Sequence, residues 1–354
     1  MRMNNALNHF KLEGTPVSCD IYGSGHINRT ELVTTDAGRR YILQQINNSI
    51  FTDVDALMAN IVAVTGYLAR QDADPRHVLT LVPTLDGKSY YRDEQDRYFR
   101  VYKFIEDSIC LDKAENAEDF YQSAVAFGNF QNQLSGFPAA TLNETIPRFH
   151  DTPNRYAQLD AAIKADTMNR LREVGPEIDF VMARRDEAAT MTNMLAAGEL
   201  PLRVTHNDTK LNNVMLDART RTPLCVIDLD TVMPGLAGND FGDSIRFGAS
   251  TALEDEKDLN KVSMSLELYS AYARGYLGAC RNLTAAERAT LPMGAKLMTL
   301  ECGVRFLSDY LAGDVYFHVS RPEHNLDRCR TQFKLVASME AQWDAMRRVI
   351  DELG

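Results

Sequence analysis

Hydrophobic residues follow two different periods in this chain of 354 residues, and the change falls near residue 105. Before it, short apolar runs broken by Gly and turn-forming residues indicate strands at 17–22, 30–35, 40–47, 89–91 and 97–105. One segment differs, because residues 53–70 place apolar side chains at three- and four-residue spacing, as in an amphipathic helix. The first 105 residues therefore predict a sheet covered by one helix.

After residue 105 the apolar pattern is mainly helical. Stripes that indicate helices run through residues 120–134, 259–276, 297–311 and 333–350. Two apolar runs flank the turn-forming stretch 217–223 and indicate a hairpin within the helical part. The chain thus predicts an α+β fold with two lobes, a small β-rich lobe over residues 1–105 and a larger, mainly helical lobe over residues 106–354.

The charge balance and the cysteines narrow the function classes. With 38 Lys and Arg against 49 Asp and Glu, the net charge of −11 opposes general binding to nucleic acid or to an anionic membrane. The chain has no run of 18 apolar residues and no apolar core near its start, so we expect neither a membrane span nor a signal peptide, and a cytoplasmic protein. The six cysteines are scattered without a C-x-x-C pair, which indicates reduced thiols rather than a zinc site.

The most informative motif is the segment HNDTKLNN at residues 206–213, which is followed by an apolar strand and then by Asp228-Leu229-Asp230. Phosphoryl transfer from a nucleotide needs a carboxylate near the attacking hydroxyl and oxygen ligands that hold Mg²⁺ against the phosphates. Asp208 can supply the first, and Asn213 with Asp228 the second, while Lys210 can neutralise the transferred group. The spacing of Asp208 and Asn213 matches that of the protein-kinase pattern H-R-D-x-x-x-x-N.

The segments HNDTKLNNVMLD, VIDLDTVMPG and NDFGDSIRF resemble the aminoglycoside phosphotransferase and choline kinase superfamily. Within it, the chain is most similar to bacterial N-acetylhexosamine 1-kinases, which phosphorylate free GlcNAc or GalNAc at the anomeric hydroxyl. The resemblance implies a protein-kinase-like fold, ATP and Mg²⁺ as cofactors, and a small sugar as substrate. By position it implies that Asp208 is the catalytic base, Asn213 and Asp228 are metal ligands, and Asp230 is an additional carboxylate at the metal.

The triplet D-F-G at residues 240–242 invites a different assignment, since protein kinases place a metal-binding Asp in such a triplet. It lies far beyond Asn213 and follows a loop rather than a strand, so we interpret it as structural. We expect Asn239, Asp240 or Asp243 to cap the helix that follows.

A second motif lies between the first two predicted strands, where Gly23 and Gly25 precede His26, Asn28 and Thr30. Taken alone, it fits an ordinary tight turn. Because it joins two strands rather than a strand and a helix, it favours the hairpin that covers ATP phosphates in kinases. The glycines would let the backbone approach the phosphates, and the polar side chains would add donors.

The nucleotide-binding strands depart from the protein-kinase pattern. Where protein kinases carry a strand Lys, residues 41–46 read YILQQI, and the helix over 53–70 contains no Glu to pair with such a Lys. The absence of both the Lys and the Glu is physically consistent, because either residue alone would leave an unpaired charge in a cleft. We predict that Gln44 or Gln45 contacts the phosphates as a neutral donor. The resemblance also places Tyr102 and Phe104 at the lobe connection beside the adenine.

For the acceptor, the resemblance implies a pocket in the helical lobe with Asp208, Phe247, Arg305 and Tyr316 on its walls. An aromatic ring can pack on the C–H side of a pyranose, and Arg305 can donate paired hydrogen bonds. The structural alternative is that Arg305 pairs with Glu301 one turn earlier and that Tyr316 belongs to the core. Two other functions stay open, namely another small-molecule kinase acting on an aminoglycoside, choline or homoserine, and a nucleotide-binding scaffold without turnover.

Overall fold

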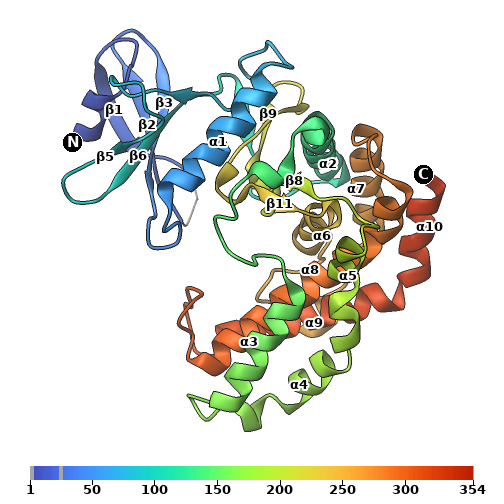
Figure 1. The fold of residues 1–354 in the computed structure, drawn as a ribbon. Coiled ribbons are helices and arrows are strands. Elements are labelled where there is room, and N and C mark those ends of the chain that lie inside the picture. Colours follow the sequence, from blue (N-terminus) through green and yellow to red (C-terminus); the bar gives the residue numbers. More distant parts are fainter. Residues whose placement is uncertain (1–3, 24–26, 354) are drawn as a thin grey trace. The chain divides into compact units, whose positions relative to one another are not determined.

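The computed structural model describes residues 4–23 and 27–353, which form two compact units (Figure 1). Unit 1 comprises Met1–Ile109, Gly136–Pro147 and Met215–Met233, and unit 2 comprises Cys110–Ser135, Arg148–Val214 and Pro234–Gly354. The first boundary follows Ile109 rather than residue 105. Unit 1 also contains two later segments, one of which carries Asp228 and Asp230, that the sequence pattern places in the helical lobe.

Unit 1 contains an antiparallel sheet in the order β1-β2-β3-β6-β4, with β5 also paired to β6. Its strands are β1 (Pro16–Ile21), β2 (Arg29–Thr35), β3 (Arg40–Ile46), β4 (Leu81–Val82), β5 (Tyr91–Arg92) and β6 (Tyr98–Lys103). Alternate residues face the core, as period-2 patterning requires, so Val33, Leu43 and Val101 are fully buried. The short helix η1 (Asn5–His9) adds Leu7 to this core.

Helix α1 (Val54–Ala69) forms where its apolar stripe predicts it. It begins at Asp53, whose carboxylate accepts a hydrogen bond of 2.9 Å from the backbone N–H of Ala56. The stripe residues that the sequence picks out are all buried, and Met58 of the same helix contacts Arg100 of β6. The predicted hairpin is also present, as β9 (Val214–Asp217) and β10 (Pro223–Val226), with β7 (Ser108–Cys110) on the other side of β9.

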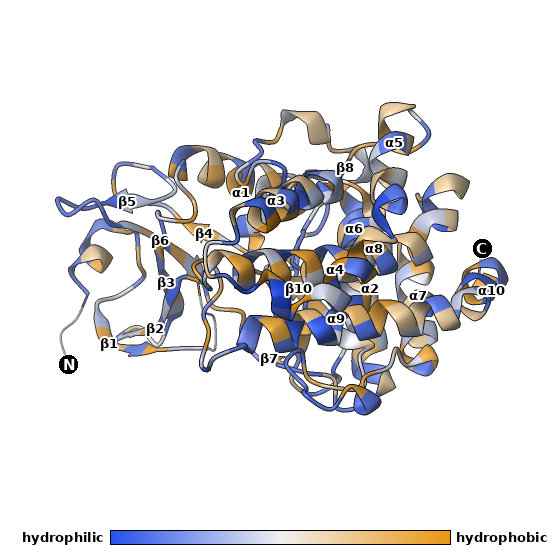
Figure 2. Ribbon diagram, turned by 90° about the horizontal axis from the view of Figure 1, so that it is seen from below, coloured by the Kyte–Doolittle hydropathy of each residue, from blue (hydrophilic) through white to orange (hydrophobic). Residues whose placement is uncertain are grey.

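Unit 2 is mainly helical, and Figure 2 shows hydrophobic and hydrophilic stretches alternating along its helices. The helices are α2 (Ala117–Gln133), α3 (Thr152–Ala165), α4 (Gly175–Met182), α5 (Thr190–Ala196), α6 (Ala237–Gly248), α7 (Leu266–Ala279), α8 (Ala285–Ala312), α9 (His324–Ala341) and α10 (Trp343–Leu353). The short strands β8 (Arg203–Thr205) and β11 (Met233–Gly235) pair with each other. A sheet in unit 1 and mainly helices in unit 2 confirm the predicted α+β class.

Two predicted helices differ from the structure. The stripe over residues 259–276 predicts one helix, but Leu259–Lys261 forms a short 3₁₀ turn and α7 begins only at Leu266. The stripe over residues 333–350 also predicts one helix, whereas α9 ends at Ala341 and α10 begins at Trp343. In both cases a continuous apolar period spans a backbone break, since Val262 and Tyr269 are buried on either side of the first break, and Met339 and Met346 on either side of the second.

Helix α8 carries Arg305, one of the predicted acceptor residues. A capping box formed by Thr284 and Glu287 fixes its start, and Gly313, with a φ of 102°, ends it in the left-handed conformation. No helix in residues 4–23 and 27–353 is both long enough and apolar enough to span a membrane.

Candidate active site

The predicted catalytic loop, residues 206–213, connects β8 to β9. Within it, the Asn213 amide nitrogen donates to the backbone oxygen of Asp208 at 2.8 Å and to its Oδ2 at 3.1 Å. Lys210 Nζ lies 2.8 Å from Asp208 Oδ1. The structure therefore brings together the predicted base, the predicted phosphoryl-neutralising Lys and one predicted metal ligand.

The Lys210 ammonium stays charged in this setting. Burial lowers its pKa, but the charge and hydrogen bond of Asp208 outweigh that effect, so the pKa of Lys210 lies above its ordinary value. The pairing also holds the Asp208 carboxylate in one place, with its side chain 28% exposed and so open to an acceptor.

Two carboxylates of α6 hold the loop by its backbone. The Asp240 carboxylate accepts the N–H groups of His206 and Asn207, both at 2.8 Å, and Asp243 Oδ2 accepts the N–H of Thr209 at 3.0 Å. Backbone donors aimed at a buried carboxylate are charge-assisted hydrogen bonds, which are shorter and stronger than neutral ones. The position of Asp208 is thus set by its neighbours on the same loop.

The prediction that Asn239, Asp240 or Asp243 caps α6 is wrong, because the N-cap residue is Leu236 and all three lie inside the helix. The D-F-G triplet nevertheless has a structural role at each position. Asp240 binds the loop, and Phe241 packs edge-on against three tyrosines, Tyr269, Tyr272 and Tyr276. Gly242 lets α8 approach, since a Cβ there would lie 2.3 Å from the carbonyl oxygen of Gly294.

In unit 1, Asp228 follows β10 and adopts the left-handed conformation, with a φ of 58°. A non-glycine residue in this region is strained, and such strain is concentrated at functional sites. Two residues later, Asp230 is 3% exposed. Its Oδ1 lies 2.5 Å from Arg100 Nη1, and its Oδ2 accepts a hydrogen bond of 2.6 Å from the Asn28 side chain.

Arg100 is a residue that the sequence reasoning missed. It lies on β6 opposite Gln44 of β3 and is 1% exposed. Its Nε and Nη2 donate to Gln44 Oε1 at 3.0 and 2.8 Å, and Gln44 Nε2 in turn donates to Thr30 Oγ1 at 3.1 Å. The positive charge that protein kinases place on β3 therefore lies one strand away here, and its counter-ion is Asp230 rather than a helix Glu. The signal available in the sequence was an Arg in the middle of the predicted strand at residues 97–105.

The structure describes only some of the other residues that the sequence predicts to contact the nucleotide. Gly25 and His26 lie outside the described residues. Gly23 has a φ of 78°, in the left-handed region that glycine adopts without strain. Gln45 lies on β3 opposite Phe99, so it points to the other face of the sheet from Gln44.

At the predicted adenine side, Tyr102 is buried, and its hydroxyl has no hydrogen-bond partner in the described part of the chain. The Phe104 N–H donates to the carbonyl oxygen of Arg40 at 3.2 Å. This backbone donor is therefore already used within unit 1.

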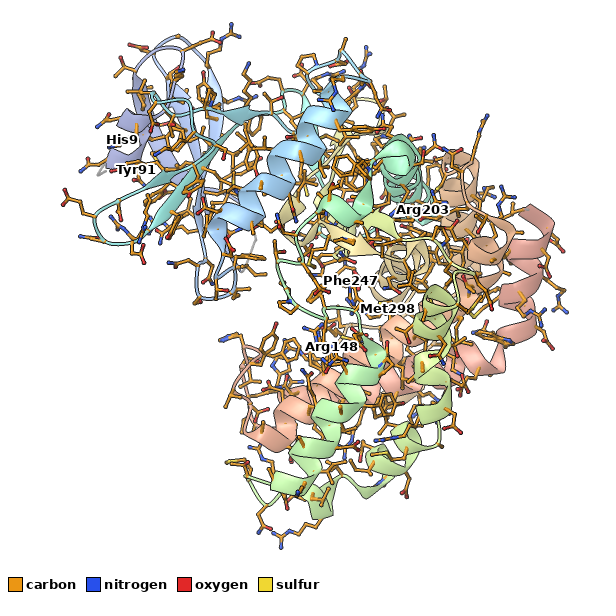
Figure 3. The ribbon with its side chains drawn as sticks, viewed as in Figure 1. His9, Tyr91, Arg148, Arg203, Phe247 and Met298 are labelled. Carbon is orange, nitrogen blue, oxygen red and sulfur yellow. The ribbon has the colours of Figure 1, made fainter. Side chains whose placement is uncertain are left out.

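The predicted acceptor residues belong to unit 2. Phe247, labelled in Figure 3, lies in the last turn of α6 and is 36% exposed. Tyr316 is 66% exposed, so the alternative that it belongs to the core is wrong. The Arg305 guanidinium lies 5.8 Å from the Tyr316 ring centroid, with Phe149 and Phe317 at 5.6 and 5.3 Å, which places these aromatic rings around one cation.

The loop that carries Tyr316 is held by a second residue that the sequence reasoning missed. The buried Asp309 carboxylate accepts the backbone N–H groups of Val315, Tyr316 and Phe317 at 2.9, 2.8 and 3.0 Å. An exposed aromatic ring on a loop fixed in this way is preorganised to contact a ligand.

The donors present suit a hard cation. Carboxylate and amide oxygens are the ligands that Mg²⁺ prefers, and Mg²⁺ usually takes one or two carboxylates plus phosphate oxygens and water. Because the Asn213 amide nitrogen donates to Asp208, its oxygen is the atom left for a metal. In residues 4–23 and 27–353 there is no cluster of three or more His, Cys, Asp or Glu side chains arranged for a metal ion.

Comparison with known proteins identifies the family. A model of the phosphotransferase enzyme family that includes the aminoglycoside phosphotransferases matches residues 19–286, so the chain belongs to this family. An aminoglycoside phosphotransferase from Alicyclobacillus acidocaldarius has a similar structure at 14% identity, with a TM-score of 0.66 over 99% of this chain and 97% of that one. A choline kinase from Cryptosporidium parvum is similar at 14% identity, with a TM-score of 0.54 over 95% and 92%.

An amicoumacin kinase in complex with AMP-PNP and Ca²⁺ is also similar, at 16% identity and a TM-score of 0.59 over 93% of this chain and 91% of that one. These matches confirm the predicted kinase-like fold, with a β-sheet N-terminal region and a helical C-terminal region. Membership of this family makes the protein an enzyme, a phosphotransferase.

Proposed function

We propose that the enzyme transfers the γ-phosphoryl group of ATP to the anomeric hydroxyl of an N-acetylhexosamine, GlcNAc or GalNAc, in the cytoplasm. The products are hexosamine 1-phosphate and ADP. The proposed ATP-binding residues belong to unit 1, and the proposed acceptor-binding residues belong to unit 2. The observation that carries the choice of acceptor is the Arg305 guanidinium of α8 near three aromatic rings. One of these rings, Tyr316, is exposed on the loop whose backbone Asp309 binds.

In this mechanism Asp208 accepts the proton of the anomeric hydroxyl. The hydroxyl oxygen forms a bond to the γ-phosphorus while the bond from that phosphorus to the β-phosphate oxygen breaks. Lys210, which pairs with Asp208 in the structure, offsets charge on the transferred group. Asn213 and Asp228 would hold Mg²⁺, which neutralises the phosphates when bound.

Asp230 stays in the proposal as the carboxylate beside the metal. Since Arg100 and Asn28 already engage its two oxygens, we assign the main ligand role to Asp228. Gly23, Gly25, His26, Asn28, Thr30, Gln44 and Gln45 are the proposed phosphate contacts, and Tyr102 and Phe104 the proposed adenine contacts. Arg100 supplies positive charge behind them in place of the absent strand Lys.

Charge in unit 2 supports a neutral acceptor over a cationic one. A cationic acceptor, such as choline or an aminoglycoside, needs carboxylates that are not already engaged. Near the loop, Asp240 and Asp243 bind backbone N–H groups, and Asp243 also pairs with Arg246 at 2.9 Å. The proposed acceptor residues instead present an Arg and aromatic rings, which suit the hydroxyl and acetamido oxygens and the C–H face of a sugar.

A coupled assay of ADP release with GlcNAc, GalNAc, glucose, choline and kanamycin tests this proposal. We expect the highest kcat/KM with the two N-acetylhexosamines and turnover at background with choline and kanamycin. The Asp208→Asn variant, purified in parallel, shows how much release comes from contaminating kinases. A higher kcat/KM for choline or kanamycin would reject the proposed acceptor while leaving the kinase assignment intact.

A further inference from the structure

A largely buried histidine outside the predicted site contacts the catalytic loop. His150 lies just before α3, with a side chain 10% exposed. Its Nδ1 is 3.0 Å from Oε1 of Glu301 in α8, and its Nε2 is 3.2 Å from the backbone oxygen of Asn207, the residue before Asp208. All of these residues belong to unit 2.

Both neighbours of the ring can only accept hydrogen bonds. A neutral imidazole has one N–H, so one of its nitrogens would face an oxygen lone pair without a proton between them. The imidazolium ion has two N–H groups and satisfies both contacts. The geometry therefore selects the protonated form of His150, provided that Glu301 is ionised.

Glu301 is ionised in this setting. Its side chain is 2% exposed, and its Oε2 accepts the Thr152 hydroxyl at 2.8 Å. Burial raises the pKa of the Glu301 carboxyl, but the hydrogen bond and charge of His150 and the nearby guanidinium of Arg155 lower it below its ordinary value. The ionised Glu301 carboxylate therefore favours the imidazolium form of His150.

The charged groups around His150 agree with this state. Burial lowers the pKa of His150, but the hydrogen bond and charge of Glu301, the charge of Asp243 and the Asn207 carbonyl raise it above its ordinary value. The groups facing this cluster from the packed elements are Glu301 and Arg305 of α8, Asp243 of α6, Thr152 and Arg155 of α3, and the Phe149 ring.

We propose that His150, as an imidazolium ion, is a positioning residue that holds the catalytic loop in its active conformation by binding the carbonyl of Asn207. Asn207 has a φ of 65°, a conformation in which the loop must be supported from outside. Asp240 binds the Asn207 N–H and His150 binds its C=O, so both polar groups of this peptide segment are fixed. The fixed backbone of Asn207 orients Asp208, the next residue. The inference rests on the proposed role of Asp208 as the base.

The sign of the pH effect follows from the raised pKa. Below the ordinary histidine pKa of about 6.5 the stabilising contact is fully present, and it is lost as the pH rises through the higher pKa of the folded protein. Loop positioning, and with it kcat, should therefore fall on the alkaline side. Acceptor and nucleotide binding should change less, since His150 touches neither in this account.

The first test needs no substrate. In protein labelled with ¹⁵N-histidine, NMR should show both ring nitrogens of His150 protonated at pH 7, and the resonance should titrate above the ordinary histidine range. His150→Gln identifies the resonance, and His77, a partly exposed histidine paired with Asp72 in unit 1, serves as an internal comparison. A His150 ring that is neutral at pH 7 would overturn the proposal, whatever the acceptor proves to be.

The second test uses activity and exchange. With Gln in place of His150, kcat should fall about 10- to 100-fold, as expected for one hydrogen bond to a charged group, with KM for ATP nearly unchanged. The variant should also lose the alkaline decrease in kcat, and amide hydrogen exchange in residues 207–213 should speed up. An unaltered pH profile together with unaltered exchange would contradict the positioning role. Failure of the acceptor screen alone would leave the NMR and exchange results to decide it.

Discussion

The two units hold their proposed catalytic residues by different means. In unit 1, Arg100 and Asp230 form a buried ion pair of side chains, which Gln44 and Asn28 extend by hydrogen bonds. In unit 2, the catalytic loop is held by its backbone, because Asp240 and Asp243 accept its N–H groups.

The difference predicts different responses to mutation. A buried ion pair is costly to break on one side, since the remaining charge is left without a partner, but removing both charges can be nearly neutral. A loop held by its backbone has no such compensating variant, because its donors are main-chain atoms. A double variant should therefore restore the free energy of unfolding in unit 1 but not in unit 2.

The largest effect is expected for Asp208→Asn, which removes the proposed base while keeping the shape of the side chain. We expect kcat to fall about 10²- to 10⁴-fold, the range for loss of general base catalysis, with little change in ATP affinity. Steady-state kinetics and calorimetric ATP binding measure the two quantities. Asp86→Asn, at a side chain 62% exposed in unit 1, is the control. A kcat within threefold of the wild type would dismiss Asp208 as the base.

The next effect tests the ion pair of unit 1. Arg100→Met leaves the buried Asp230 without its counter-ion and should lower the free energy of unfolding by about 3–5 kcal/mol. The double variant Arg100→Met/Asp230→Asn should recover most of that loss. Urea unfolding of the two variants measures it. If the double variant is less stable than Arg100→Met, the two side chains do not stabilise the fold as a pair.

In unit 2, Asp240→Asn should cost about 1–3 kcal/mol, because an amide NH₂ would then face one of the backbone donors that the carboxylate now accepts. No second substitution removes the backbone N–H groups that Asp240 accepts. Adding Gln131→Leu, which removes a side-chain donor to Asp240, should therefore not restore stability. The unfolding free energies of the single and double variants provide the measurement. Full recovery in the double variant would remove the contrast between the two units.

The smallest effect concerns the acceptor loop. Tyr316→Ala should raise KM for the acceptor about 5- to 10-fold, equivalent to about 1 kcal/mol of aromatic contact, while stability changes little because the ring is 66% exposed. Leu253→Ala, at a side chain 72% exposed in the same unit, should leave both quantities unaltered. A Tyr316→Ala variant with unchanged KM would remove Tyr316 from the acceptor site.

The sequence predicted most of the elements because their patterns are local. The strands of unit 1 and helix α1 follow from alternation and from the stripe that begins at Val54. The spacing of Asp208 and Asn213 likewise lies within one loop, and the structure joins them by hydrogen bonds. The helix ends near residues 262 and 342 were missed because the apolar period continues across both breaks.

The supporting partners could not be predicted, because they come from distant parts of the chain. Arg100 meets Asp230, His150 meets Glu301, and Asp309 meets the backbone of the loop at Tyr316. The fold brings these distant residues together, and neither the hydrophobic period nor the spacing within a motif predicts such a pairing. The strand Lys of protein kinases is absent from residues 41–46, as the sequence shows, and the structure adds a buried Arg100 on the neighbouring strand.

The central claim is phosphoryl transfer to an anomeric hydroxyl, and the ¹H-coupled ³¹P NMR spectrum of the product formed from ATP and GlcNAc tests it most directly. The account predicts a new phosphomonoester signal split into a doublet by the single anomeric proton. A signal split by two protons, as for a 6-phosphate, or the absence of any sugar phosphate while another acceptor is phosphorylated, would contradict it.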